Sequence, residues 1–315
     1  MVNPVNVKIL VLSICVLAIA AGPVVTQNST VAVAPMQMRG LMPVIEVKLN
    51  GQGPFAFMID TGSGLQADID TSVAERLGLQ ANGTVINGDP SGENDREVAT
   101  ATIDSIVIAG QESTSTARAA EDTRGRRISE APVVEFRNVI AVVRPQRITK
   151  DYPDVDGILG FALFSDYLLT LDYRAMQVRL ARGALPPANG ADILDFEIEN
   201  RVPVIQLAIG KICVPAHIDS GNFVAGFILP EEIVEQLQLL SPPVTVGLAR
   251  SVSNQIELKQ AQLRDTIRLG RFEFPQPTIR FPALSDTNVG FNVLRDFALT
   301  FDQKNKRVKF ERLPR

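Results

Sequence analysis

The chain has 315 residues, of which 45% are hydrophobic, so it can form one large domain or two moderate ones around a hydrophobic core. Its 31 basic and 35 acidic residues give a formal net charge of −4, without the basic surplus that binding to nucleic acid requires. Of the two cysteines, Cys15 lies in an N-terminal apolar segment, which leaves Cys213 without a disulfide partner in the rest of the chain. We therefore expect a globular protein that does not bind nucleic acid.

The N-terminal segment 1–25 has the pattern of a secretory signal peptide. Lys8 precedes an apolar run over 9–21, and Ala18 and Ala20 are small residues at the spacing that favours cleavage after Ala20. An uncleaved membrane anchor is the alternative, although a membrane span needs about 20 apolar residues. We expect an exported protein, periplasmic or secreted, with membrane association through this segment as the open alternative.

The body of the chain consists of short segments rich in Val, Ile and Phe, separated by turn residues, which predicts a mainly β fold. Two passages share one plan: segment 43–47 leads through Gly51 to 57–60, and segment 203–207 leads through Gly210 to 217–219. Position 43 thus corresponds to position 203, and position 60 corresponds to position 219. The offset in residue number is almost the same for both pairs. The near-constant offset indicates an internal duplication.

A second set of identities supports the duplication. Segment 103–110 resembles 263–270, each an alternating strand closed by glycine. Further identities recur at one constant offset: Gly160, Phe161, Asp166, Thr170 and Asp172 match Gly290, Phe291, Asp296, Thr300 and Asp302. We predict an N-terminal lobe at 36–184, a Pro-rich linker at 185–195 and a C-terminal lobe at 196–315. Helices should be few and short, with the best candidates at 72–79 and 230–239.

Each copy carries an aspartate where an apolar strand ends. The first motif is Asp60-Thr61-Gly62-Ser63 and the second is Asp219-Ser220-Gly221-Asn222. One such triplet would be an ordinary turn, because Asp, Ser and Gly are common turn residues. Two copies at equivalent points of a duplicated chain can face each other across a pseudo-twofold axis. Two carboxylates that share a site cannot both ionise cheaply, so they would hold one proton between them.

These two motifs, together with Asp156-Gly157-Ile158-Leu159-Gly160, resemble the pepsin and retropepsin superfamily of aspartic peptidases, in particular the bacterial retropepsin-like proteins with two lobes in one chain. The resemblance spans residues 36–313. The segment that corresponds to 158–160 in the second copy is Asn288-Val289-Gly290. The resemblance implies a bilobal acid-protease (pepsin-like) fold, with two β-barrel-like lobes related by a pseudo-twofold axis.

The same resemblance implies an aspartic endopeptidase, a hydrolase in which Asp60 and Asp219 activate a water molecule without a metal, a cofactor or a covalent intermediate. Thr61 and Ser220 would bond across the lobes through their hydroxyls. Its substrates would be proteins or peptides, and because one chain carries both motifs a monomer would suffice.

The remaining loop residues would support the two acids. Gly62 and Gly221 would let backbone N–H groups approach the carboxylates, because a side chain at these positions would obstruct that approach. Ser63 would bond the outer oxygen of Asp60. Asn222 departs from the hydroxyl that the family has there, although its amide could donate in a similar way.

A substrate-covering flap is expected at about 85–99, which has turn chemistry at 87–92 but lacks the tyrosine of pepsin-type flaps. The polar run 111–130 is interpreted as a solvated insertion, with contact to an acidic partner as the alternative. It holds four arginines: Arg118, Arg124, Arg126 and Arg127.

Other chemically capable residues have structural interpretations. His217 is the only histidine, which excludes a second imidazole for metal binding, and we expect it and Cys213 to have packing roles. The repeated aspartates at 156, 166, 172, 296 and 302 suit turns and caps, and Phe161, Phe164, Phe291 and Phe297 suit the core. Two other functions stay open: a catalytically weak or inactive peptide-binding protein of the cell envelope on the same fold, and a structural or assembly factor of the envelope.

Overall fold

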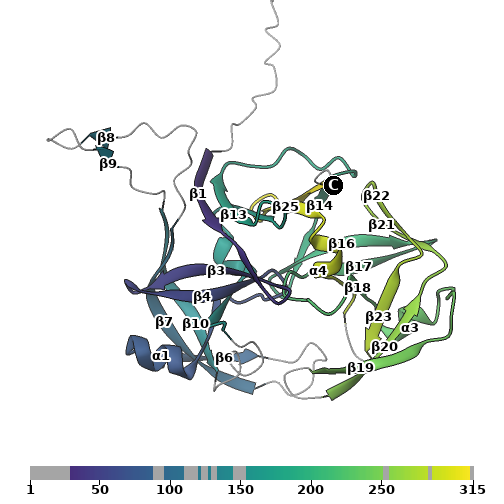
Figure 1. Cartoon of the computed structure of the whole chain (residues 1–315), viewed down its shortest axis with the longest axis horizontal. Helices are drawn as coiled ribbons and strands as arrows, with labels where there is room; N and C mark the ends of the chain where they lie inside the picture. Colours follow the sequence, from purple (N-terminus) through teal and green to yellow (C-terminus); the bar gives the residue numbers. More distant parts are fainter. Residues whose placement is uncertain are drawn as a thin grey trace, which may run out of the picture.

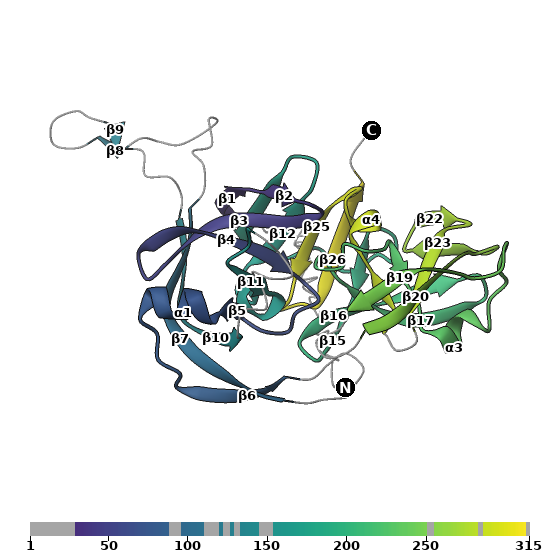
Figure 2. The same ribbon diagram turned by 60° about the horizontal axis from the view of Figure 1, so that its bottom comes forward.

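The computed structural model describes residues 29–87, 96–109, 120–121, 127–128, 133–144, 154–250, 255–282 and 286–312. The segment expected to be a signal peptide or anchor lies outside these residues. Two groups of strands, from the first and second halves of the chain, lie on either side of a central sheet (Figures 1 and 2). The fold is mainly β with two lobes, as the sequence predicts. Within the described residues, none of the helices has both the length and the apolar character to cross a membrane.

The first lobe is an eight-stranded sheet with the order β2-β3-β4-β11-β5-β10-β7-β6, which an additional β3–β7 pairing closes on itself. A separate two-stranded ribbon lies between β7 and β10 in the chain. The elements of this half are β2 (Gln37–Arg39), β3 (Met42–Leu49), β4 (Gln52–Asp60), β5 (Ala67–Asp70), α1 (Thr71–Leu77), β6 (Gly83–Asn87), β7 (Arg96–Ala109), β8 (Ala120–Glu121), β9 (Arg127–Ile128), β10 (Val133–Arg144), β11 (Gly157–Gly160) and the 3₁₀ turn η1 (Phe161–Phe164).

The second lobe is a ten-stranded sheet with the order β19-β20-β23-β18-β24-β17-β16-β21-β22, in which β15 also pairs with β16. Its elements are β15 (Glu197–Glu199), β16 (Val202–Ile209), β17 (Ile212–Ile218), β18 (Phe227–Ile228), α3 (Glu231–Val234), β19 (Val244–Arg250), β20 (Gln255–Gln262), β21 (Thr266–Leu269), β22 (Phe272–Pro275), β23 (Thr278–Pro282), β24 (Asn288–Val289) and α4 (Phe291–Leu294).

The two helices predicted from the sequence differ in outcome. α1 confirms the prediction at 72–79: the side chain of Asp70 caps its first turn by accepting from Val73 N, and Gly78 ends it in the left-handed conformation. α3 is shorter than the predicted 230–239. Leu239 instead forms a β-bridge with Leu263, so tertiary pairing ends the helix early.

A six-stranded sheet joins the two lobes, in the order β1-β13-β12-β25-β26-β14. Its strands are β1 (Ser29–Pro35), β12 (Leu168–Asp172), β13 (Gln177–Arg182), β14 (Ile193–Asp195), β25 (Phe297–Asp302) and β26 (Arg307–Arg312). At its centre β12 pairs antiparallel with β25, its own counterpart in the duplication, with Thr170 opposite Thr300. Their hydroxyl oxygens are 2.9 Å apart. The repeat found in the sequence is therefore a structural pseudo-twofold whose axis passes between these threonines.

The threonine pair permits a test of this central contact. Thr300→Val should lower the free energy of unfolding by about 1 kcal/mol, because the Thr170 hydroxyl then loses its partner. In the double variant Thr170→Val/Thr300→Val the loss should be smaller than the sum of the two single losses, since both polar groups are removed together. Urea denaturation of the four proteins measures this, and strict additivity would contradict the contact.

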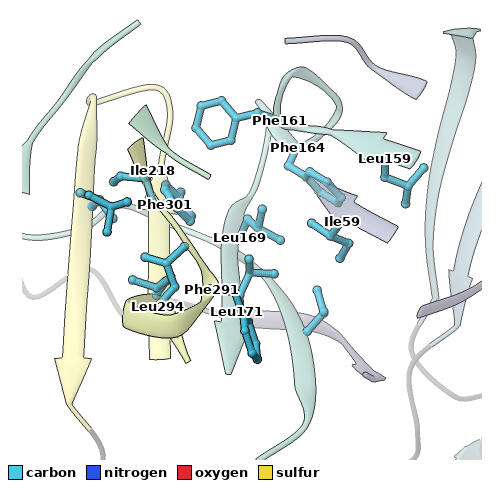
Figure 3. Close-up of a cluster of buried hydrophobic side chains, with 14 of the residues drawn as sticks. Ile59, Leu159, Phe161, Phe164, Leu169, Leu171, Ile218, Phe291, Leu294 and Phe301 are labelled. Carbon is cyan, nitrogen blue, oxygen red and sulfur yellow. The ribbon is translucent and has the colours of Figure 1, made fainter. Parts of the chain in front are cut away.

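One hydrophobic core continues through both lobes and lies directly beneath the two aspartate-bearing loops. Ile59 and Ile218, the residues before each aspartate, are fully buried in it (Figure 3). Phe161 of the first copy packs edge-to-face on Phe301 of the second, with ring centroids 5.4 Å apart. The phenylalanines that the sequence assigned to the core are buried, which confirms that interpretation: Phe161, Phe164, Phe291 and Phe297. A packed core under both loops holds them in fixed positions.

Candidate active site

Each aspartate sits at the end of a strand that has a parallel neighbour. β4 ends at Asp60, opposite Gly160 of β11. β17 ends one residue before Asp219, whose backbone N–H donates to the Val289 carbonyl of the parallel strand β24, at 3.0 Å. The two strand pairs are equivalent in the duplication, so the same local fold presents one carboxyl from each lobe.

The two carboxyls meet between the loops and lie within hydrogen-bonding reach of each other. Gly62 N donates to Asp60 Oδ1, and Gly221 N donates to Asp219 Oδ1, each at 2.8 Å. Each glycine also packs against the opposite acid. A Cβ on Gly62 would come within 2.5 Å of Asp219 Oδ1, and one on Gly221 would come within 2.5 Å of Asp60 Oδ1. Any side chain there would push the carboxyls apart, which accounts for glycine at both positions.

Thr61 and Ser220 tie the loops together across the lobes, and both are completely buried. Thr61 Oγ1 donates to Ile218 O at 2.7 Å and accepts from Ser220 N at 3.0 Å. Ser220 Oγ donates to Ile59 O at 2.8 Å and accepts from Thr61 N at 2.9 Å. The cross-lobe bonding expected of these hydroxyls is present, and its four bonds are reciprocal.

The residues after the two glycines do not bond as the family resemblance implies. Ser63 Oγ accepts from Leu65 N at 3.5 Å, and among the described hydrogen bonds it has none to Asp60. Asn222 donates through its backbone N–H to Asp219 Oδ1 at 3.0 Å, but its side-chain amide donates to Asn288 Oδ1 at 2.7 Å. Asn288 Nδ2 donates to Asp219 Oδ2 at 2.6 Å.

Asn288 is the site residue that the sequence reasoning did not single out. Its only signal was a polar side chain in the place that Ile158 occupies in the first copy.

The electrostatics of the pair are those of two acids that share one proton. Burial raises the pKa of the Asp60 carboxyl well above its usual range, and the negative charge of Asp219 and the hydrogen bond to it act in the same direction. The N–H groups of Gly62 and Gly221 oppose this rise. Burial and both carboxylates also raise the pKa of the nearby Tyr173 hydroxyl, so this group stays protonated.

The raised pKa of Asp60 predicts how stability depends on pH. The folded state keeps a proton on Asp60 that the unfolded chain releases above about pH 4. This contribution to stability is therefore complete below about pH 4 and is lost as the pH rises through the folded-state pKa. Asn at this position cannot ionise. The Tm of Asp60→Asn should thus increasingly exceed that of the wild type as the pH rises from about 4 towards neutrality, and a constant Tm difference would contradict the raised pKa.

The flap expected at 85–99 falls on the hairpin of β6 and β7, which pair from Gly83 with Thr100 to Asn87 with Arg96. Its tip, 88–95, lies outside the described residues. A second hairpin, β19 with β20, extends from the other lobe, and Figure 1 shows both on the same side of the molecule. Most of the insertion 111–130, including Arg118, Arg124 and Arg126, also lies outside the described residues.

The other singled-out residues take part in local structure. Three of the repeated aspartates accept backbone hydrogen bonds, as turn and loop residues do: Asp156 from Ala56, Asp172 from Ala175 and Asp302 from Leu185.

His217 lines a pocket beside α3 with Glu199, Glu232 and Asp286. Cys213, expected in the core, is exposed instead, because its side chain points outward where Val214 points inward. In the described part of the chain, no group of three or more His, Cys, Asp or Glu could hold a metal ion.

The chain is similar to known proteins in part of its sequence and in its fold. A family model described as aspartyl protease matches residues 45–163, which include Asp60 and most of the first lobe. No curated protein matches the chain. Among solved structures, conglutin gamma, a basic 7S globulin from lupine seeds, is similar with a TM-score of 0.50 at 11% identity, covering 90% of this chain and 95% of that one.

Basic 7S globulin from soybean has a TM-score of 0.48 at 10% identity and the same two coverages. The protein edgp has a TM-score of 0.49 at 10% identity, covering 90% of this chain and 94% of its own. The aspartyl protease model thus matches the part of the chain that carries the first aspartate, and the two-lobed fold of the whole chain is similar to that of conglutin gamma.

Proposed function

We propose that this protein is an aspartic endopeptidase, which hydrolyses peptide bonds with a water molecule activated between Asp60 and Asp219. The observation that carries the proposal is the pair of hydrogen-bonded carboxyls, one from each lobe, of which Asp60 has a raised pKa. Such a pair holds one proton at moderately acidic pH, so it contains a base and an acid side by side.

Each member of the pair then has one step to perform. The ionised carboxylate takes a proton from the water as the water oxygen attacks the peptide carbonyl carbon. The protonated carboxyl gives its proton to the carbonyl oxygen, so the tetrahedral diol forms without a net change of charge. The cross-lobe bonds of Thr61 and Ser220 keep the two carboxyls at a constant separation while the proton changes place.

The proposal extends to the localisation, the oligomeric state and the substrates of the enzyme. The pattern of the segment 1–25 supports export, to the periplasm or outside the cell, either free or anchored by this segment. Both acids come from one chain, which supports activity as a monomer. The substrates would be proteins or peptides bound in extended form beneath the two hairpins.

A second candidate is a peptide-binding protein with weak or no hydrolysis. It is motivated by Ser63 and Asn222, whose side chains do not bond the aspartates as the superfamily resemblance implies. Both aspartates and both cross-lobe hydroxyls are nevertheless in place, which favours the enzyme.

A peptide-library assay separates the two candidates. The wild type is incubated with the library from about pH 3 to pH 8, with and without pepstatin, and the products are identified by mass spectrometry. We expect pepstatin-sensitive cleavage at internal bonds, and none with the double variant Asp60→Asn/Asp219→Asn. Cleavage by the double variant would contradict the proposal. Saturable binding of peptides without cleavage by the wild type would favour the binding protein.

A further inference from the structure

The two acids of the pair differ in the groups that bond them. Asp219 accepts from two backbone N–H groups at Oδ1, those of Gly221 and Asn222, and from the Asn288 amide at Oδ2. Asp60 accepts from Gly62 N at Oδ1 and is also approached by the N–H of Gly221, and Ile158 occupies the place equivalent to Asn288 in its lobe. Ile158 has no hydrogen-bond donor in its side chain and packs against a small apolar cluster. The pseudo-twofold symmetry of the hydrogen bonds around the two acids is therefore broken at Asn288, as well as at the pair Ser63 and Asn222.

The direction of the Asn288 amide is imposed by the backbone. Val224 N and Ala225 N both donate to Asn222 Oδ1, at 3.2 and 3.3 Å. The Asn222 side chain must then turn its Nδ2 towards Asn288, where it donates to Oδ1 at 2.7 Å. With Oδ1 so occupied, Asn288 presents Nδ2, a donor, to Asp219 Oδ2.

A donor held in this way favours the charged form of the acid that it faces. A carboxylate oxygen can only accept, and a fixed N–H donor bonds it more strongly than it bonds a neutral carboxyl. The three donors on Asp219 therefore act together to stabilise its negative charge.

We propose that Asn288, held in orientation by Asn222, is a positioning residue that keeps Asp219 ionised and thereby places the shared proton of the pair on Asp60. The inference rests on the proposed peptidase function for its catalytic meaning. Within that reaction Asp219 is the base that takes the proton from water, and Asp60 is the acid that gives its proton to the carbonyl oxygen.

The direction of the pKa shift of Asp60 agrees with this assignment. Burial and the neighbouring charge raise the pKa of Asp60, which favours its protonated form. Among the described residues, Asp60 and Tyr173 are titratable groups that interact with Asp219, and the Tyr173 hydroxyl stays protonated in this environment. Among the described residues, no positive charge acts on the pKa of Asp60 in a way that would reverse this preference.

The first experiment needs no activity. The wild type is labelled with ¹³C at the aspartate carboxyl carbon, and the two resonances of the pair, assigned with Asp60→Asn and Asp219→Asn, are followed by NMR from about pH 2 to pH 8. We expect the Asp219 resonance to report the first ionisation and that of Asp60 the second. If Asp60 ionises first, the proposal is wrong, whether or not any peptide is cleaved.

The second experiment replaces Asn288 by Leu, a side chain of similar size without a donor. The first ionisation of the pair should move to higher pH by about one unit, because a hydrogen bond to a charged group is lost. In kcat/KM the acidic limb should move by the same amount, so that activity falls mainly at low pH. An unshifted first ionisation in a folded variant would overturn the proposal.

A matched control is available in the same chain. Asn305 Nδ2 donates to the buried Asp302 at 2.8 Å, at the end of β25 in the central sheet, and among the described hydrogen bonds it has none to either acid of the pair. Asn305→Leu makes the same chemical change at a structural aspartate and should leave the titration of the pair unchanged. An equal shift in this control would show a general effect of lost stability and would also count against the proposal. If Asn288→Leu does not fold, the titration of the wild type still shows which of the two acids ionises first and so tests the proposal.

Discussion

Asp219→Asn should lower kcat/KM for peptide hydrolysis about 10²- to 10⁴-fold, the usual contribution of a positioned acid or base. Asn keeps the shape of the side chain, and its oxygen can still accept from Gly221 N, so the loop is preserved. It cannot take a proton from water. Asp60→Asn should cause a loss of similar size, because the pair then has no proton to give to the carbonyl oxygen. Initial rates on a peptide found in the library assay measure both effects.

The matched control is Asp156→Asn. Asp156 belongs to the segment 156–160, which resembles the aspartic peptidases as the two aspartate motifs do. It accepts from Ala56 N at 2.7 Å, but it makes no bond to either acid of the pair in the described structure. Its conversion to Asn should leave kcat/KM within a few-fold of the wild type. Activity retained by Asp60→Asn or Asp219→Asn would contradict the shared pair, while equal losses in all three variants would indicate a defect of folding instead of chemistry.

Much of this site could be predicted from the sequence because its parts are repeated. Asp60 and Asp219 follow equivalent strands, and Thr170 and Thr300 keep a constant offset with their neighbours. A duplicated chain with one acid in each copy can bring the two acids together at a pseudo-twofold axis. The pairing of β12 with β25 shows that axis.

Asn288 could not be recognised in this way, because it is a departure from the repeat. Its action depends on which atom of its amide faces Asp219. That is decided by Asn222, and in turn by the backbone N–H groups of Val224 and Ala225. The contacts of Asn288 with Asn222 and with Asp219 join residues 66 and 69 positions apart, so neither a local motif nor periodicity contains them. The length of α3 escaped prediction for a similar reason, since the bridge of Leu239 to Leu263 is a tertiary contact.

Ser220→Ala should lower the free energy of unfolding by about 2–5 kcal/mol, a large part of the roughly 5–15 kcal/mol that folded proteins usually have. The substitution leaves Thr61 N without its acceptor and Ile59 O without its donor. Both groups lie where Thr61 and Ile59 are fully buried, so water cannot replace the lost bonds without opening the core. The Tm from circular dichroism and the urea midpoint measure the loss.

Thr61→Ser is the control, because it keeps the hydroxyl that donates to Ile218 O and loses only a methyl group, at about 1 kcal/mol. Thr61→Val keeps the shape and loses the hydroxyl, so it should resemble Ser220→Ala. The double variant Thr61→Val/Ser220→Ala should lose less than the sum of the two, since the four reciprocal bonds act as one unit.

Ser220→Ala should lower both the stability and the catalytic rate, whereas Asp219→Asn should lower the catalytic rate alone. The hydroxyl of Ser220 contacts the strand that presents Asp60, so its loss frees the two loops to move apart. The carboxyls then spend less time within reach of one water molecule, and kcat should fall even where the variant is fully folded. If Ser220→Ala were as stable as Thr61→Ser and equally active, the cross-lobe bonds would not hold the pair, and the core beneath Ile59 and Ile218 would have to position it alone.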